Sequence, residues 1–133
     1  MILLDTHVLV WLDEGSNRLG VKARNIIDEA LSEERLLVAA ISFWEIAMLV
    51  EKNRLEIKMD LQNWRRELLE KGLQEIAMHG ALGVQAGQLS GFHGDPADRI
   101  IVATALSIAA TLVTADEKIL AWQGLSAKLS ARI

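Results

Sequence analysis

The sequence predicts an α/β fold with a mostly parallel central sheet, and two observations support this prediction. Short, strongly apolar runs of strand length alternate along the chain with longer segments in which apolar residues recur at helical spacing. Strands that alternate with helices are joined by right-handed crossovers, which set neighbouring strands parallel. No internal repeat, low-complexity tract or linker interrupts the alternation. We therefore expect residues 1–133 to form a single domain.

The apolar runs predict strands at 2–5, 36–40, 73–78, 111–114 and 126–133. The helical pattern predicts helices at 21–33, 42–51, 61–71, 81–89, 96–109 and 117–122. The helix at 21–33 has the clearest apolar face, made of Ala23, Ile26, Ile27, Ala30 and Leu31. Residues 8–12 form a further short apolar segment to which the pattern assigns no element.

Composition and charge exclude several classes of protein. The chain is 51% hydrophobic, which is enough to bury a substantial core. It has no cysteine, which excludes thiol catalysis, disulfides and thiolate zinc sites and fits a reducing compartment such as the cytoplasm. Its longest apolar stretches are too short to span a bilayer, and no signal peptide is expected. The net charge of −4 argues against a protein that coats nucleic acid by charge alone, but not against an enzyme that reaches phosphates through a bound metal.

Four carboxylates stand where an α/β fold places its chemistry. Asp5 and Asp116 end apolar strands, and Glu45 and Asp98 lie in the first turns of two helices. In an open parallel sheet, ligands bind outside the carboxyl ends of the strands, where helix N-termini also meet. Acids brought together there repel one another unless a cation or protonation relieves the charge. Because oxygen ligands select hard cations, the four acids are candidate ligands for Mg²⁺ or Mn²⁺.

Each acid also has a purely local interpretation. Glu45 stands three residues after Ser42, which is the spacing of a capping box. Asp98 falls in the first turn of its helix, where an acid favours the helix dipole, and Asp116 can cap the helix that follows it. Asp5 is harder to explain locally, because an unpaired carboxylate at the end of a central strand would cost several kcal/mol. The local interpretations do not predict that all four acids meet.

Four short segments carry a family resemblance. They are LLDTHVLVW at 3–11, SFWEIA at 42–47, HGDPADRIIVATA at 93–105 and LVTAD at 112–116. In this order, spread over nearly the whole chain, they resemble the PIN-domain ribonucleases and, among these, the VapC-like toxins of prokaryotic type II toxin–antitoxin pairs. Residues 52–89 carry no such motif and add nothing to the resemblance.

The resemblance implies a three-layer α/β/α sandwich that hydrolyses RNA in the cytoplasm. The acidic quartet of the family falls on Asp5, Glu45, Asp98 and Asp116, with no departure at any of the four. These residues would hold Mg²⁺ or Mn²⁺, and a water activated by the metal would attack the RNA phosphodiester. One or two metal ions are both compatible with four acids.

The resemblance also implies protein partners. A small cognate antitoxin is expected across the active-site groove, and a homodimer is expected from the family and from the hydrophobic excess of so small a chain. Because four carboxylates create a negative potential, the antitoxin should present a cation there, with arginine favoured for its bidentate geometry. Exposed apolar surface is expected to rim the groove and to include Trp11 or Trp44, which flank the first two acids.

Several neighbouring residues are candidates for accessory roles. Thr6 and Thr114 flank the acids and would position water or phosphate, although a local backbone hydrogen bond explains each of them equally well. Arg99 follows Asp98 and would contact phosphate or pair with an acid. The three histidines, His7, His79 and His93, lack the spacing of a zinc motif. His93 is expected to make a loop hydrogen bond, and no catalytic role is assigned to any histidine.

Three other functions remain open from the sequence. A phosphatase of the haloacid-dehalogenase type would need a second acid two residues after the first strand-end acid, where His7 stands instead. A phospho-receiver would need a pair of acids at the first strand, which has only Asp5. A degenerate PIN-like domain would act only as a non-catalytic binding or scaffold module, against which the four intact acids argue.

Overall fold

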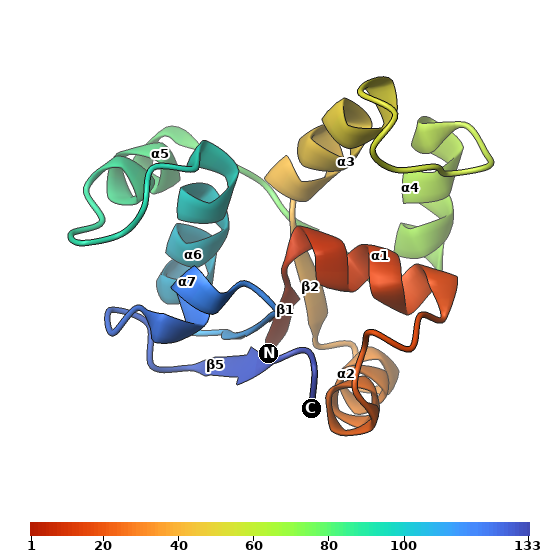
Figure 1. Ribbon diagram of the computed structural model, residues 1–133, viewed down its shortest axis with the longest axis horizontal. Helices are drawn as coiled ribbons and strands as arrows, with labels where there is room; N and C mark the ends of the chain where they lie inside the picture. Colours follow the sequence, from red (N-terminus) through yellow and green to blue (C-terminus); the bar gives the residue numbers. More distant parts are fainter.

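The computed structural model describes all 133 residues as a five-stranded parallel sheet covered by helices on both faces (Figure 1). The strands are β1 (Ile2–Leu4), β2 (Leu36–Ala39), β3 (Gln74–Ile76), β4 (Thr111–Thr114) and β5 (Lys128–Ser130). Their order across the sheet is β3-β2-β1-β4-β5, and every neighbouring pair is parallel. The predicted three-layer α/β/α architecture is confirmed, with a sheet that is parallel throughout.

Seven helices connect the strands. They are α1 (Thr6–Glu14), α2 (Val21–Ser32), α3 (Ile41–Glu51), α4 (Leu61–Glu70), α5 (Gly80–Gly87), α6 (Pro96–Ile108) and α7 (Glu117–Ala121). Six of them were predicted, with ends that differ by a few residues at most, whereas α1 was not assigned from the sequence. None of the seven has the length and apolar character that crossing a membrane requires.

The two faces of the sheet bury different helices because successive strand residues point to opposite sides. On one face, Ile2 and Leu4 pack into a core with residues of α1, α2 and α4, which include the buried Trp64. On the other face, Leu3 packs with residues of α6 and α7, such as Ile101 and Ile119. Helix α5 lies outside this layer and packs on α6. The short strand β1 is therefore buried on both faces at the centre of the molecule.

The strand order positions the functional end of the sheet. From β1 the chain crosses to β2 on one side, and from β3 it crosses back over the sheet to β4 on the other side of β1. Crossovers that diverge in this way leave a crevice at the carboxyl ends of the two strands between which the order reverses. Here those strands are β1 and β4, which end immediately before Asp5 and two residues before Asp116.

The C-terminal segment returns to this crevice and is held there by the start of α2. The amide of Gly20 donates to the carbonyl oxygen of Ala131 at 2.8 Å, and the amide of Lys22 donates to that of Ile133 at 2.9 Å. The two backbones approach so closely that a Cβ atom at position 20 would overlap the carbonyl carbon of Ile133. Only glycine fits this contact, which keeps Arg132 beside the crevice.

We therefore expect Gly20→Ala to lower the free energy of unfolding by about 1–3 kcal/mol, because the added methyl group forces the C-terminal segment away. Gly80→Ala is the matched control, since a Cβ atom there meets nothing within 4 Å. Urea unfolding followed by circular dichroism measures both variants. Equal stability of the two variants would contradict this account of the C-terminal segment.

Candidate active site

All four predicted acids line one pocket of about 370 Å³ at the carboxyl ends of β1 and β4. They come from four separate elements, so the fold brings together residues that lie up to 111 positions apart. The complete lining consists of Asp5, His7, Trp11, Glu45, Asp95, Asp98, Ala115, Asp116 and Arg132. The local interpretation and the convergence both hold for two of the acids. Asp98 lies in the first turn of α6, and Asp116 caps α7.

Asp5 is the most deeply placed of the four acids, with an exposed fraction of only 7%. It caps the N-terminus of α1, where one carboxylate oxygen accepts a hydrogen bond from the Thr6 amide at 2.9 Å. The other oxygen accepts from the Thr114 hydroxyl at 2.6 Å. Burial raises the pKa of the Asp5 carboxyl, and these two hydrogen bonds oppose the rise only in part.

Thr114 connects two of the acids across the end of β4. Its buried hydroxyl donates to Asp5 and accepts a hydrogen bond from the backbone amide of Asp116 at 3.0 Å. Because both its donor and its acceptor functions are used, the hydroxyl has a fixed direction. Asp116 in turn caps α7, accepting from the amides of Lys118 at 2.8 Å and Ile119 at 3.2 Å through one oxygen. Its local capping role is confirmed.

Glu45 lies in α3 on another side of the same pocket, but the expected capping box is wrong. Helix α3 begins at Ile41, and Ala40 at its N-cap provides no side-chain cap. Ser42 lies inside the helix, fully buried, and accepts a hydrogen bond from the Thr6 hydroxyl at 2.9 Å. The carboxylate of Glu45 is therefore not committed to the helix end. Its pKa is raised by burial and by the charges of Asp5 and Asp95, and Thr6 partly opposes the rise.

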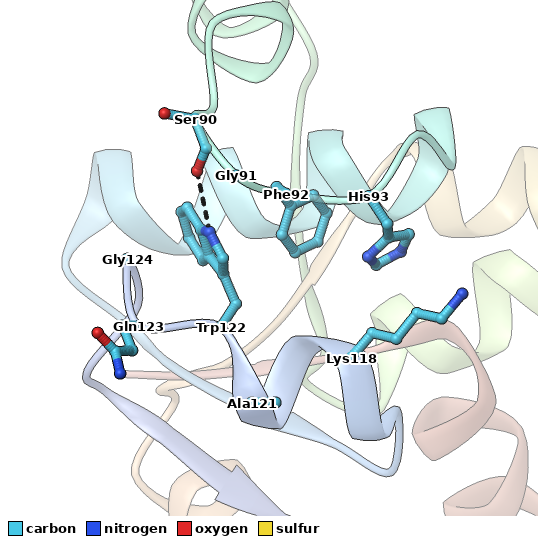
Figure 2. A pocket seen from close by; sticks show the side chains of 9 residues that line it. All are labelled: Ser90, Gly91, Phe92, His93, Lys118, Ala121, Trp122, Gln123 and Gly124. Carbon is cyan, nitrogen blue, oxygen red and sulfur yellow. Dashed lines mark hydrogen bonds between the residues drawn. The ribbon is translucent and has the colours of Figure 1, made fainter.

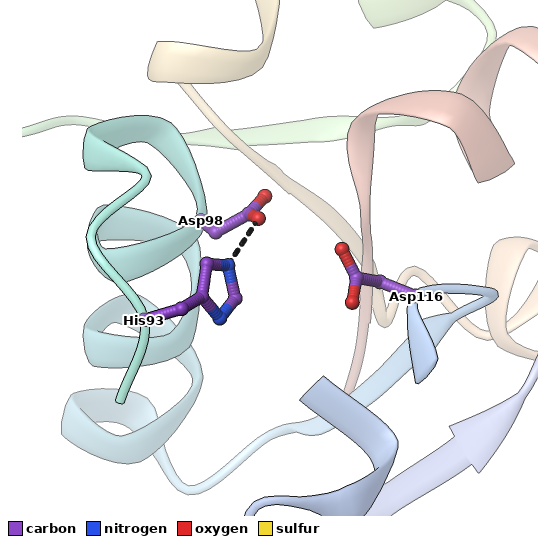
Figure 3. Close-up of side chains that lie close together, drawn as sticks. All are labelled: His93, Asp98 and Asp116. Carbon is purple, nitrogen blue, oxygen red and sulfur yellow. Dashed lines mark hydrogen bonds and ion pairs between the residues drawn. The ribbon is translucent and has the colours of Figure 1, made fainter. Parts of the chain in front are cut away.

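Asp98 stands at the first turn of α6, opposite Asp116 (Figure 3). One of its oxygens lies 2.7 Å from Nε2 of His93, and its backbone amide donates to the carboxylate of Asp95, which caps the helix. Burial raises the pKa of Asp98 to about 6 against the opposing contact with His93, and the charges of Asp5, Asp95 and Asp116 add to the rise. The carboxyl groups thus lie close enough to perturb one another electrostatically.

Two groups of side chains could hold a cation. Ligand atoms of His93, Asp98 and Asp116 lie within 4.8 Å of one another, and so do those of Glu45, Asp95 and Asp98. Because Asp98 belongs to both groups, the two positions are adjacent parts of one acidic pocket. The carboxylates that dominate both sets are ligands for hard divalent cations.

Arg99 does not form the ion pair with an acid that was one of its two expected contacts. Its guanidinium group donates to five backbone carbonyl oxygens, which belong to Ala86, Gly87, Leu89, Phe92 and His93. It pairs with no acid and does not line the acidic pocket. Its contacts instead fix the segment between α5 and α6, including the backbone of His93. Thr6 and Thr114 differ from Arg99, since both touch residues of the pocket.

The structure adds three residues to those singled out from the sequence. His93, expected to make only a loop hydrogen bond, contacts the Asp98 carboxylate, and Asp95, which caps the same helix, lines the acidic pocket. Both residues could have been found from the sequence, because a histidine and a capping acid directly precede the helix that carries Asp98. Arg132 lines the pocket with its guanidinium carbon 5.4 Å from the centre of the Trp11 ring. No local pattern indicates this contact, which depends on the path of the C-terminal segment. His7 lines the pocket, whereas His79 caps α5.

Two solved structures share the fold over nearly the whole chain. One is the crystal structure of VapBC2 from Rickettsia felis bound to a DNA fragment from its promoter, with a TM-score of 0.71, 19% identity and 98% of each chain covered. The other is a toxin–antitoxin complex from Klebsiella pneumoniae, with a TM-score of 0.65, 20% identity and coverage of 97% and 96%. At this level of identity, the likeness concerns the fold alone.

A curated relative and a family model match the sequence itself. The curated protein Ribonuclease VapC22 from Mycobacterium tuberculosis (strain ATCC 25618 / H37Rv) is 36% identical over 119 residues, which cover 89% of this chain and 88% of the relative. The family model described as PIN domain matches residues 2–123, a range that contains all four acids. On this match and this identity, the chain belongs to the PIN domain family.

Proposed function

We propose that this protein is a metal-dependent endoribonuclease that acts as the toxin of a toxin–antitoxin pair. The observation that carries the proposal is the convergence of Asp5, Glu45, Asp98 and Asp116 on one pocket. The relative with 36% identity is named as a ribonuclease, and one of the matched structures is a toxin–antitoxin complex. Four intact acids that line one pocket favour a catalytic protein over a degenerate scaffold.

The pocket fits a hard divalent cation, and we propose Mg²⁺ or Mn²⁺. Carboxylate oxygens provide most of the available ligand atoms, and the chain has no cysteine that would favour a softer metal. Burial and, to a smaller extent, the charges of neighbouring acids raise the pKa of Asp5, Glu45 and Asp98, which disfavours their charged forms. A divalent cation would stabilise those charged forms.

The residues around the pocket would have different roles in phosphodiester hydrolysis. Asp5, Asp98 and Asp116 would hold the cation, which when bound neutralises phosphate charge and lowers the pKa of the attacking water. Thr114 keeps Asp5 and the start of α7 in a fixed relation. Glu45, whose carboxylate is not used by a helix cap, would accept the proton of the attacking water. No nucleophilic side chain is needed.

We further propose an RNA substrate, a small antitoxin, a homodimer and a cytoplasmic location. The exposed apolar side chains that partners could cover include Val21, Val84 and Trp44, which are 78%, 60% and 51% exposed. Trp44 precedes Glu45, so a protein bound there would lie next to the acidic pocket. The negative pocket would favour an antitoxin that inserts an arginine.

Metal-free protein should lose stability as the pH rises. The pKa of Asp98 is about 6 in the folded protein and about 3.8 when unfolded. As the pH rises, the unfolded state therefore loses the Asp98 proton at a lower pH than the folded state does. The contribution of Asp98 to the free energy of unfolding should therefore fall between about pH 4 and pH 6, by at most about 3 kcal/mol. Asp98→Asn should remove this contribution, since an amide keeps the polar contact without the charge. The raised pKa of Asp5 and Glu45 should leave a further loss of stability with rising pH in both proteins.

Added Mn²⁺ should raise the melting temperature of the wild-type protein at pH 7 and leave that of Asp98→Asn nearly unchanged. Differential scanning fluorimetry in chelator-treated buffer, with and without the metal, measures both effects. Identical pH profiles for the two proteins, together with no response to Mn²⁺, would argue against a metal site at Asp98.

RNA cleavage should require the acids and the metal. Asp5→Asn and Asp98→Asn should each reduce cleavage of total RNA by about a hundredfold or more, since each removes a carboxylate that would hold the cation. Asp28→Asn, an exposed acid on α2, is the matched control and should cleave normally. EDTA should abolish cleavage, Mg²⁺ or Mn²⁺ should restore it, and a zinc-selective chelator should have no effect. Undiminished cleavage in EDTA would refute metal dependence.

Co-expression with the product of the neighbouring gene tests the toxin role. We expect the two proteins to co-purify, the cleavage activity to be inhibited in the complex, and light scattering after size-exclusion chromatography to show a dimer of the isolated toxin. Replacing the arginines of the partner one at a time should identify one whose loss releases activity. A monomer that neither binds nor is inhibited by that partner would contradict the toxin role. The proposed nuclease function would be unaffected by that result.

A further inference from the structure

A second and larger cavity adjoins the acidic pocket. Its volume is about 680 Å³, within the range of about 300–1,000 Å³ typical of small-molecule sites. It lies between the segment that precedes α6 and the end of α7 (Figure 2). Its most prominent side chains are three neighbouring aromatic rings, in which Phe92 meets Trp122 edge to face at 72° and is tilted by 33° against His93. The ring centres are 5.1 Å apart for Phe92 and Trp122 and 4.2 Å apart for Phe92 and His93.

The aromatic residues are held in place by contacts with the loop before α6, the loop after α7 and the Arg99 side chain. The indole N–H of Trp122 donates to the carbonyl oxygen of Ser90 at 3.1 Å, across the mouth between the two segments. The indole lies directly over Gly124, where a Cβ atom would overlap the ring. The guanidinium group of Arg99 holds the carbonyl oxygens of Phe92 and His93 at 3.0 and 3.1 Å. The wall is therefore formed before any ligand arrives, which reduces the entropy lost on binding.

His93 joins this cavity to the acidic pocket. Its ring forms the end of the aromatic row, and its Nε2 atom lies 2.7 Å from the carboxylate of Asp98. A molecule whose phosphate reaches the acids would therefore place its adjacent group at the aromatic wall. Lys118 runs along the α7 side of the cavity, is exposed, and takes part in none of the ion pairs of the protein. Its ammonium group is free to contact a phosphate.

We propose that this cavity is the subsite for one unstacked nucleobase next to the scissile phosphate of single-stranded RNA. The proposal rests on the ribonuclease function proposed above. Unstacked bases are recognised in proteins by stacking on an aromatic side chain, and the ring of Trp122 would provide that face, with Phe92 and His93 beside it. Lys118 would contact the phosphate of that nucleotide and provide local positive charge on a chain whose net charge is −4. The cavity would thereby set which phosphodiester reaches Asp98 and its neighbours.

The test begins on the RNA rather than on the protein. A cleavage site is first mapped in total RNA, and a short oligonucleotide that spans it is prepared with an abasic nucleotide at each position in turn. For the wild-type protein, one position adjacent to the cleaved bond should raise KM about tenfold and leave kcat nearly unchanged, because stacking is lost there. Abasic nucleotides at the other positions should have smaller effects.

Protein variants then place that base in the cavity. Trp122→Leu keeps an apolar side chain without a large aromatic face and should raise KM about tenfold, whereas Trp122→Phe should restore much of the loss. In Trp122→Leu the critical abasic nucleotide should have no further effect, which a merely structural role of Trp122 would not produce. Lys118→Ala should raise KM and weaken its dependence on salt. Lys71→Ala, an exposed lysine at the end of α4, should leave both unchanged.

Each other outcome overturns the subsite. Normal KM for every abasic oligonucleotide overturns it even if Trp122→Leu fails to fold, because this experiment uses the wild-type protein. Additive effects of Trp122→Leu and the abasic nucleotide place the base elsewhere. Normal cleavage by Trp122→Leu with weaker inhibition by the antitoxin assigns the cavity to a protein ligand. In these three cases the ribonuclease function stands, whereas no metal-dependent cleavage of any RNA removes that function and the subsite with it.

Discussion

The repulsion between carboxylates at the end of β1 and β4 is the constraint on which the rest of this structure depends. Asp5 is nearly buried beneath the others, and burial together with neighbouring charge raises its pKa and that of Asp98. Two devices hold the acids in place despite the repulsion. Helix N-termini accept Asp5 and Asp116 as caps, and the Thr114 hydroxyl links both residues. The fold thus prepares a site whose charge a cation would balance.

Most of the architecture could be predicted from the sequence because its periodic patterns were clear. The five strands, of which β1, β2 and β4 are the most buried, and the helices with a distinct apolar face were confirmed. Helix α1 was missed because residues 8–12 are apolar on nearly every side, so no helical face stands out, and because Asp5 was interpreted as a strand end rather than as a cap. The capping box at 42–45 was wrong because tertiary packing buries Ser42 against Thr6, and α3 begins one residue earlier.

The four acids could be located from the sequence because parallel topology brings strand ends and helix N-termini together, although Glu45 lies further into α3 than the sequence predicts. The contacts that surround the acids could not be predicted from the sequence. The partners of Arg99 are backbone carbonyl oxygens of an irregular segment, whose path no pattern specifies. Arg132 reaches the pocket only because Gly20 lets the C-terminal segment pass closely. His93 meets Asp98 through a turn whose geometry the arginine fixes. Such contacts depend on tertiary packing rather than on local spacing.

The central claim is that the acidic pocket is a cation site, and anomalous diffraction from crystals grown with Mn²⁺ tests it most directly. Data collected near the manganese absorption edge locate the ion independently of any enzymatic assay. The account predicts a strong anomalous peak within about 2.5 Å of carboxylate oxygens of Asp98 and of Asp5 or Asp116. A pocket without a peak at saturating Mn²⁺, or a peak only at acids outside this pocket, would contradict it.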